Sequence, residues 1–202
     1  MNRVEIKSYK THKILFSGYY SSVTECIEDA VTQKVDLSFA DLSNQNLSNG
    51  NFDGAKLSGA LMSGANLTGA NFSESNLQNV LFTDTSLYNT CFCYSDLSAS
   101  NFKNASFGAT DIAGCDLREC EFSTLSCFSL DFTSIKTMHG STYHSSNGTL
   151  CAMSSRPIVM NGILNSPIII MDHVTKIGHR LFPKEMMWHI PMILKHSTEN
   201  GR

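Results

Sequence analysis

Residues 65–69 read Ala-Asn-Leu-Thr-Gly and residues 70–74 read Ala-Asn-Phe-Ser-Glu, two copies of one five-residue pattern. The pattern extends in both directions, and from Val35 to Ser134 an apolar residue, nearly always a large one, returns at every fifth position without a change of register. These positions are Leu37, Leu42, Leu47, Phe52, Leu57, Met62, Leu67, Phe72, Leu77, Phe82, Leu87, Phe92, Leu97, Phe102, Phe107, Ile112, Leu117, Phe122, Cys127 and Phe132. A period of five fits neither a helix nor a flat strand, so the stretch is interpreted as an internal repeat.

Two residues before most of the large residues lies a small one, such as Ala55, Ala65, Ser75 or Cys115. The other three positions of each repeat are mostly Asn, Asp, Ser, Thr or Gly. We therefore expect one large and one small side chain of each repeat to point inward, and three polar ones to face water.

This pattern resembles the pentapeptide-repeat family, whose consensus is Ala-Asp/Asn-Leu/Phe-Ser/Thr-Gly. The resemblance covers residues 35–134, which is 100 of the 202 residues. It implies an all-β fold, a right-handed quadrilateral parallel β-helix with one pentapeptide on each side and four in each coil. Five coils at a strand spacing of about 4.8 Å give a rod about 24 Å long.

Stacked coils place residue n over residue n+20, and the sequence can be checked for this register. One column is then all leucine, and a second is nearly all phenylalanine. The two columns are Leu37, Leu57, Leu77, Leu97 and Leu117, and Phe52, Phe72, Phe92, Ile112 and Phe132. This sorting of Leu from Phe favours four pentapeptides in each coil.

Three regions are predicted. Residues 1–34 are expected to form an N-terminal cap of a hairpin and an amphipathic helix, because Ser22 and Glu25 form a capping box before an apolar stripe. Residues 35–134 form the solenoid. Residues 135–202 form a connector rich in Gly, Ser and Thr (137–155), and then a small mixed cap with two or three short strands and a helical segment.

Acidic and basic residues are distributed unevenly along the chain. Residues 35–134 hold eleven acids and three bases, a net charge of −8, whereas residues 135–202 hold seven bases and three acids, a net charge of +4. Ten of the acids are candidate partner-binding residues. They are Asp36, Asp41, Asp53, Glu74, Asp84, Asp96, Asp111, Asp116, Glu121 and Asp131.

A second candidate surface is apolar. Leu61 and Leu81 replace the usual outward Asp or Asn one coil apart, and Tyr88, Tyr94 and Phe128 also occupy outward positions. Clustered outward apolar residues can mark interfaces, but tolerated surface variation is the simpler explanation of these residues. The side centred on Leu47, Leu67, Leu87, Phe107 and Cys127 carries no charge at its outward positions.

No catalytic, cofactor or metal signature is found in the sequence. Cys91 and Cys93 form a Cys-x-Cys pair, but nothing nearby in sequence completes a tetrahedral set. His139, His144 and Cys151 have no zinc spacing and are expected to be solvated loop residues. With no catalytic constellation, we expect no cofactor and no enzymatic activity. Met1–Lys7 lacks the apolar core of a signal peptide, so we expect a cytoplasmic location.

Residues 166–178 are similar to the C-terminal segment of pentapeptide-repeat proteins carried by bacteriophages, which implies a phage-encoded protein in the host cytoplasm. We expect the C-terminal region, residues 135–202, to form a homodimer through Ile168, Ile169, Ile170, Met187 and Trp188.

Two binding functions are inferred, the first from the family resemblance and the second from the surface residues of the rod. In the first, as for family members related to quinolone-resistance proteins, the acidic rod imitates duplex DNA and occupies a host topoisomerase or another host nucleic-acid-binding or defence protein, without binding nucleic acid or membrane itself. In the second, the chain is a scaffold that binds a protein through the uncharged side and the apolar patches.

Overall fold

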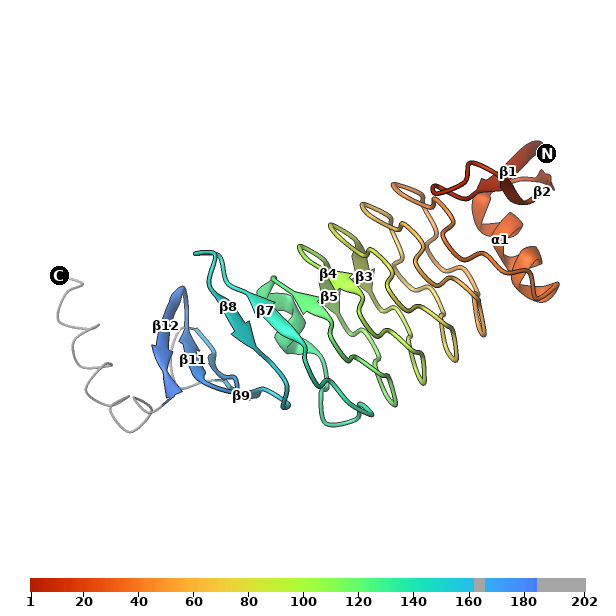
Figure 1. Ribbon diagram of the computed structural model, residues 1–202. Helices are drawn as coiled ribbons and strands as arrows, with labels where there is room; N and C mark the ends of the chain where they lie inside the picture. The colour runs from red at the N-terminus through yellow and green to blue at the C-terminus, as the bar shows by residue number, and fades with distance from the viewer. Residues whose placement is uncertain (162–165, 185–202) are drawn as a thin grey trace.

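The computed structural model describes residues 1–161 and 166–184 and shows an elongated rod of stacked coils (Figure 1). The N-terminal elements lie at one end and the last described strands lie at the other. The elements are β1 (Asn2–Lys7), β2 (Ile14–Tyr20), α1 (Val23–Thr32), β3 (Ser86–Tyr88), β4 (Asn101–Phe102), β5 (Ser106–Gly108), β6 (Glu121–Phe122), a 3-10 helix (Leu125–Ser129), β7 (Thr142–His144), β8 (Leu150–Ala152), β9 (Ile158–Met160), β10 (Ile168–Ile170), β11 (Val174–Ile177) and β12 (Arg180–Pro183). Within these ranges no helix is both long enough and apolar enough to cross a membrane.

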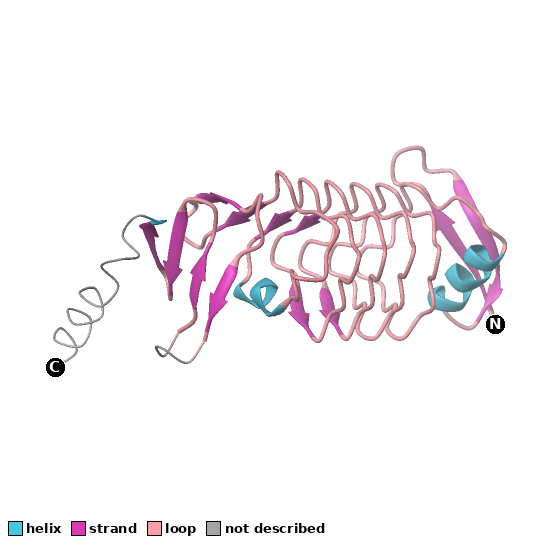
Figure 2. Ribbon diagram, turned by 90° about the horizontal axis from the view of Figure 1, so that it is seen from below, coloured by secondary structure: helices cyan, strands magenta, loops and turns pink. Residues whose placement is uncertain are grey.

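The repeat region is a β-helix-like solenoid in which each coil pairs in parallel with the next (Figure 2). Bridges join residues twenty apart, from Asp36 with Lys56 to Asp96 with Asp116, and β3–β5 and β4–β6 keep the same spacing. The large inward residues from Leu37 to Phe122 are at most 5% exposed. The predicted register and the inward and outward assignment are therefore confirmed over this part of the chain.

A left-handed backbone recurs two residues after each large residue from Leu37 to Leu117. Every fifth residue from Phe39 to Glu119 has a φ between +51° and +73°. Only Gly, and to a smaller extent Asn and Asp, adopts this region without appreciable cost, which explains why the fifth letter of the repeat is so often Gly or Asn.

The core consists of stacked columns. The Phe52, Phe72 and Phe92 rings lie 4.9 and 5.6 Å apart between successive centroids, and a second file of Phe rings runs beside this one. At the small inward position, hydroxyl and thiol groups donate to a carbonyl of the preceding coil, as Ser95 does to Phe72 (2.6 Å) and Cys120 to Leu97 (3.1 Å). These bonds satisfy polar groups inside the rod, so Ser, Thr and Cys are tolerated in place of Ala.

The register changes by one residue at the 3-10 helix. After it, Asp116 pairs with Thr137 and Glu121 pairs with Thr142, twenty-one residues away. The expectation of an unbroken register to Ser134 is therefore wrong. Parallel pairing also continues into β7, past the boundary placed after Ser134.

The 3-10 helix turns Phe128 inward. Its side chain is 7% exposed and its ring lies 5.0 Å from that of Tyr143. The assignment of Phe128 to an outward apolar surface is wrong, because the inserted residue and the helical turn rotate this pentapeptide out of the repeat geometry.

The N-terminal hairpin and helix are found as predicted. β1 and β2 pair antiparallel, and the Ser22 hydroxyl caps α1 by accepting from the Glu25 amide (3.1 Å). Cys26, Ile27 and Ala30 are buried in the same core as the coils. The Asp41 amide also donates to the Lys7 carbonyl (2.8 Å), which joins the hairpin to the first coil.

The region after the coils contains more strand than predicted. β7 and β8 lie inside the expected connector, and β9–β12 form an antiparallel sheet in the order β12-β11-β10-β9. Cys151 in β8 is 1% exposed and is therefore a core residue, not a solvated loop residue.

The expected dimerisation residues divide into two groups. Ile168, Ile169 and Ile170 form the inner strand β10 and are at most 5% exposed in the single chain, so they offer no free surface. This part of the dimer prediction is wrong. Met187 and Trp188 lie outside the described residues.

Candidate binding surfaces

The outward aspartates that precede large residues have a local structural role. The carboxylates of Asp36, Asp41 and Asp131 each accept a hydrogen bond from the backbone amide two residues later, at 2.9, 3.1 and 2.9 Å. Bonds from the Ser38 and Thr133 side chains and backbone amides lower the pKa of Asp36 and Asp131. Asn66 and Asn71 accept the same backbone bond at 3.1 and 3.0 Å, so the turn does not require a charge.

Most of the predicted acidic residues are available to a partner. Asp36, Asp41, Asp53, Glu74, Asp84, Asp111 and Asp131 are exposed. Asp96 is half-buried, and its carboxylate accepts a hydrogen bond from the side-chain amide of Gln78 (2.5 Å). These carboxylates do not form a continuous file, because Lys56 and Asn76 separate Asp36 from Asp96 along one column.

Two of the acids are neutralised within the chain. Asp116 is 6% exposed and pairs with Arg118 at 2.8 Å, and Glu121 pairs with Lys103 at 2.6 Å. His144 Nε2 lies 3.7 Å from Glu121. Asp116 occupies an outward position, but its burial makes its assignment as a contact residue wrong.

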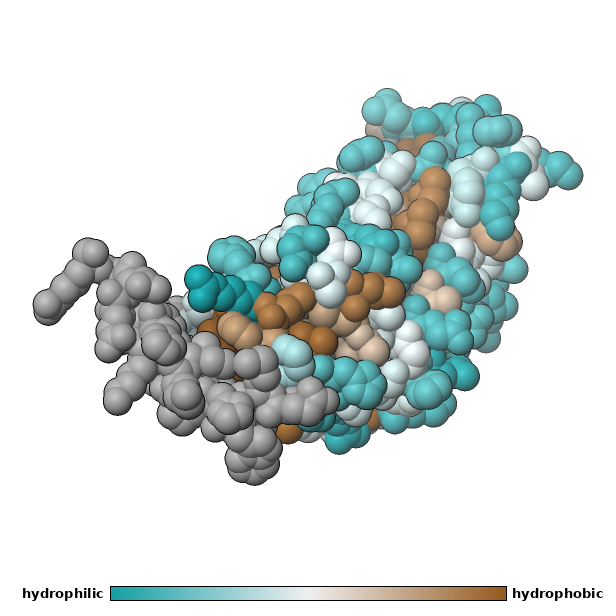
Figure 3. Space-filling model, turned by 60° about the vertical axis from the view of Figure 1, so that its left-hand side comes forward, coloured by the Kyte–Doolittle hydropathy of each residue, from teal (hydrophilic) through white to brown (hydrophobic). Residues whose placement is uncertain are grey.

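The apolar candidates are only partly gathered. Leu61 and Leu81 are paired neighbours in adjacent coils, and Leu81 is 37% exposed. Tyr88 and Tyr94 are 46% and 72% exposed and lie over glycines of the next coil. On the face drawn in Figure 3, hydrophobic residues form a narrow run along the rod and a second group nearer the C-terminal strands, with hydrophilic residues around them.

A cluster of two cysteines and one aspartate lies on the surface of the rod. The Sγ atoms of Cys91 and Cys93 are 3.1 Å apart, and Asp111 pairs with Cys91 across the ladder. One ligand atom from each of the three residues lies within 4.8 Å of the others. Burial, followed by hydrogen bonding to Cys91 and Asp111, raises the pKa of Cys93 to about 12.

The sequence analysis predicted no metal site at Cys91 and Cys93, because no third ligand lies close to them in the sequence. Asp111 is twenty residues after Cys91, so the coil register contained the signal that could have found it.

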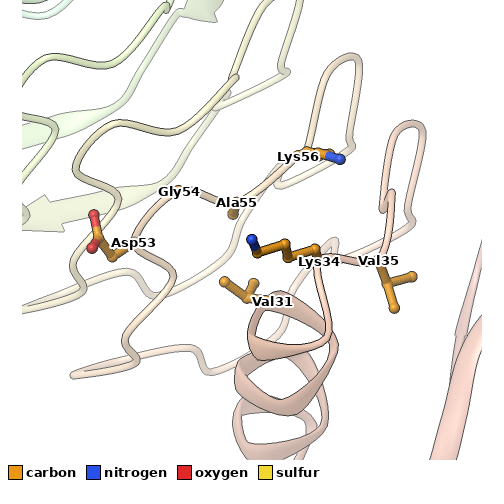
Figure 4. Close-up of a pocket in the computed structure, with 7 residues that line it drawn as sticks. All are labelled: Val31, Lys34, Val35, Asp53, Gly54, Ala55 and Lys56. Carbon is orange, nitrogen blue, oxygen red and sulfur yellow. The ribbon is translucent and has the colours of Figure 1, made fainter.

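A cavity of ≈ 220 Å³ lies between the end of α1 and a neighbouring coil (Figure 4). The Lys34 side chain extends past Val31 toward Ala55, and the carboxylate of Asp53 lies at the far side. The Lys56 amine points away from Lys34. This arrangement presents no nucleophile with an adjacent base.

Comparison with known proteins agrees with the coil geometry. Residues 36–73 and 60–98 match the sequence model of a family described as pentapeptide repeats (8 copies). The predicted resemblance to the pentapeptide-repeat family is confirmed for these residues. No curated protein matches the chain.

Several solved structures are similar to parts of the chain. One is a pentapeptide repeat protein from the thylakoid lumen of Arabidopsis thaliana, with 31% identity and a TM-score of 0.33, covering 42% of this chain and 66% of that one. Another is a pentapeptide repeat protein from Nostoc, with 21% identity and a TM-score of 0.32, covering 57% of this chain and 96% of that one. A third is QnrB1, a plasmid-mediated fluoroquinolone resistance protein, with 18% identity and a TM-score of 0.24, covering 50% of this chain and 61% of that one.

Proposed function

We propose that this chain, whose rod is made of pentapeptide repeats, is a non-enzymatic binding protein that occupies the nucleic-acid-binding surface of a protein partner. One observation carries the proposal. Within residues 35–134, nine acids have no ion-pair partner among the described residues, whereas Lys56 is the one base in that state. The nine acids are Asp36, Asp41, Asp53, Glu74, Asp84, Asp96, Asp111, Glu119 and Asp131.

The charge of these residues is separable from their structural role. Asn66 and Asn71 make the same turn bond as Asp36 and Asp131, so folding alone does not select a carboxylate at these positions. A surface with many unpaired charges of one sign attracts a partner of the opposite sign. Proteins that bind nucleic acids present such basic surfaces.

The number of unpaired carboxylates can be compared with the number of phosphates on a DNA duplex of the same length. Duplex DNA carries one charge per about 1.7 Å, so a rod about 24 Å long replaces roughly fourteen phosphates. Nine unpaired carboxylates amount to about two thirds of that charge. Binding should therefore weaken steeply as salt rises, and no single carboxylate should dominate.

The test is a variant with four substitutions that keep the turns: Asp36→Asn, Asp41→Asn, Asp84→Asn and Asp131→Asn. Parent and variant are immobilised and used to capture proteins from a bacterial lysate at increasing salt, with and without added duplex DNA. Proteins captured by the parent should be displaced by DNA and lost with the variant. The proposal would be refuted if the variant captured the same proteins as the parent and added DNA did not displace them.

A scaffold that binds through the apolar surface is the second candidate, favoured by the paired Leu61 and Leu81 and by the exposed Tyr88. Leu81→Asp with Tyr88→Ala should abolish capture under this alternative and leave capture by the acidic rod unchanged. The same lysate assay therefore distinguishes the two.

Several finer features belong to the same proposal. The solenoid winds as a right-handed, four-sided helix of about five coils with a cap at each end, and the protein acts in the cytoplasm, the host cytoplasm if it is phage-encoded. The chain forms a homodimer through residues of its C-terminal region other than Ile168, Ile169 and Ile170. Light scattering at micromolar concentration tests the dimer, and a monomeric mass would exclude it.

A further inference from the structure

We propose that Cys91, Cys93 and Asp111 form a binding site for a tetrahedral, thiolate-preferring divalent cation of the Zn²⁺ type. The two proposals share Asp111, but the four substitutions that test the function proposed above leave Cys91, Cys93 and Asp111 intact, so each proposal can fail without the other.

The coil architecture fixes the positions of the three ligands. Cys91 and Cys93 flank Phe92, which is 1% exposed in the core, so both thiols project from the same side of the rod. Asp111 follows one coil later, held by hydrogen bonds from its amide to the Thr90 carbonyl (2.9 Å) and from the Phe92 amide to its carbonyl (2.8 Å). A site on a hydrogen-bonded ladder needs little ordering when the ion binds.

The donor set suits zinc. Thiolate and carboxylate groups are established Zn²⁺ ligands, with Zn–S distances of about 2.3 Å that put two thiolates about 3.8 Å apart around a tetrahedral ion. The two Sγ atoms are 3.1 Å apart, so the thiols must separate by about 0.7 Å, which side-chain rotation provides.

The aspartate is oriented for this role. One oxygen of Asp111, Oδ1, accepts a hydrogen bond from the Ala113 backbone amide (3.0 Å), which holds the carboxylate beside the two thiols. The carboxylate is exposed, so solvent supplies the fourth ligand. Beside the thiols, Ser73 Oγ lies 3.2 Å from Cys91 Sγ and donates its own hydrogen to Asn71 Oδ1 (2.7 Å), so it neighbours the site without supplying a ligand.

Proton release gives the binding a defined pH dependence. A thiol of ordinary pKa, about 8.5, is mostly protonated at neutral pH, whereas the thiolate is the form that binds a metal ion. Zn²⁺ binds the thiolate and displaces the proton, and its affinity must therefore increase with pH.

The experiment uses the reduced, full-length chain. Cobalt(II) is titrated first, because thiolate coordination gives an intense ligand-to-metal absorption band, and Zn²⁺ is then used to displace it. One ion per chain is expected, with affinity that increases from pH 6 to pH 8.

Three variants and one control decide the assignment. Cys91→Ser and Cys93→Ser should each weaken binding at least tenfold and reduce the thiolate band, and Asp111→Asn should weaken binding at least tenfold while retaining the band. Asp131→Asn, which alters an equivalent turn acid elsewhere on the rod, should bind as the parent does. Circular dichroism confirms that each variant is folded.

The inference would be overturned by three results. The first is the absence of a thiolate band in the parent, and the second is a band that survives in the Cys91→Ser, Cys93→Ser double variant. The third is an Asp111→Asn variant that binds as tightly as the parent, which would remove the aspartate from the site.

Discussion

Replacing Phe72 by Ala should destabilise the rod by about 3 to 5 kcal/mol, the loss expected for a large core aromatic. Phe72 is fully buried, and its ring stacks between Phe52 and Phe92, at 4.9 and 5.6 Å. Each aromatic pair adds about 0.5 to 1.5 kcal/mol beyond area burial, so the loss should lie toward the upper end. Neighbouring coils cannot close the gap, because the ladder holds them at a fixed spacing.

Two other variants calibrate this value. Phe72→Leu keeps most of the apolar volume but loses both aromatic pairs, so it should cost at least about 1 kcal/mol and less than Phe72→Ala. Asn71 lies next to Phe72 but faces outward, where it accepts a bond from the Ser73 amide (3.0 Å) and donates to Asn51 (3.0 Å). Asn71→Ala should cost about 1 kcal/mol for these partly exposed bonds.

The assay is urea denaturation followed by circular dichroism, with the slope of the transition checked in each variant. A solenoid can lose cooperativity between repeats, and a changed slope would reveal that loss. Equal destabilisation by Phe72→Ala and Asn71→Ala would refute the inward and outward assignment on which the whole fold rests.

Three further predictions concern the turns, the register change and the surface acids. Ala99 has a φ of +58°, so Ala99→Gly should raise the free energy of unfolding by about 0.5 to 1 kcal/mol in thermal melts; a loss would contradict the strain argument. Phe128→Ala should cost about 3 kcal/mol in urea, whereas an outward side chain would cost almost nothing. Because their pKa values are lowered on folding, Asp36 and Asp131 stabilise the fold above the ordinary carboxyl pKa, and this contribution is lost as pH falls through their folded pKa values. Replacing both with Asn should flatten the acid limb of the stability profile, and an unchanged limb would exclude their contribution.

The coils were predictable because their signal is repeated and self-consistent. The spacing of twenty residues between stacked positions followed from the Leu and Phe columns alone, and the bridges confirm it through β6. The capping box at Ser22 and Glu25 is a similarly local pattern and is also confirmed. Such patterns need no knowledge of distant contacts.

The break in register was not predictable from the same pattern. Cys127 and Phe132 continue the five-residue spacing in the sequence, and both are buried, although the chain between them has left the coil geometry. An apolar residue at the expected position is buried equally well by a 3-10 turn. The five-residue spacing therefore cannot distinguish a regular coil from a 3-10 turn. For this reason the inward orientation of Phe128 was not predicted.

The surface sites were partly predictable for a related reason. The sequence shows which residues are charged, but it does not show which charges are neutralised by an ion pair. The Lys103 and Glu121 pair joins adjacent coils, and the Arg118 and Asp116 pair involves a buried carboxylate. The cysteine cluster likewise depends on a contact between coils.

The residues that stabilise the fold of the rod are different from the charged groups that its outer surface offers to a partner. Folding depends on the inward columns, on the left-handed turn position and, at many repeats, on an oxygen acceptor before the large residue, which Asn and Asp supply equally well. The charge of the outward surface can therefore change without loss of the turns. Asp-to-Asn variants isolate recognition from folding for that reason. A change in partner binding without a change in the urea midpoint would assign the carboxylates to recognition, and parallel changes in both would mean that charge is part of the fold.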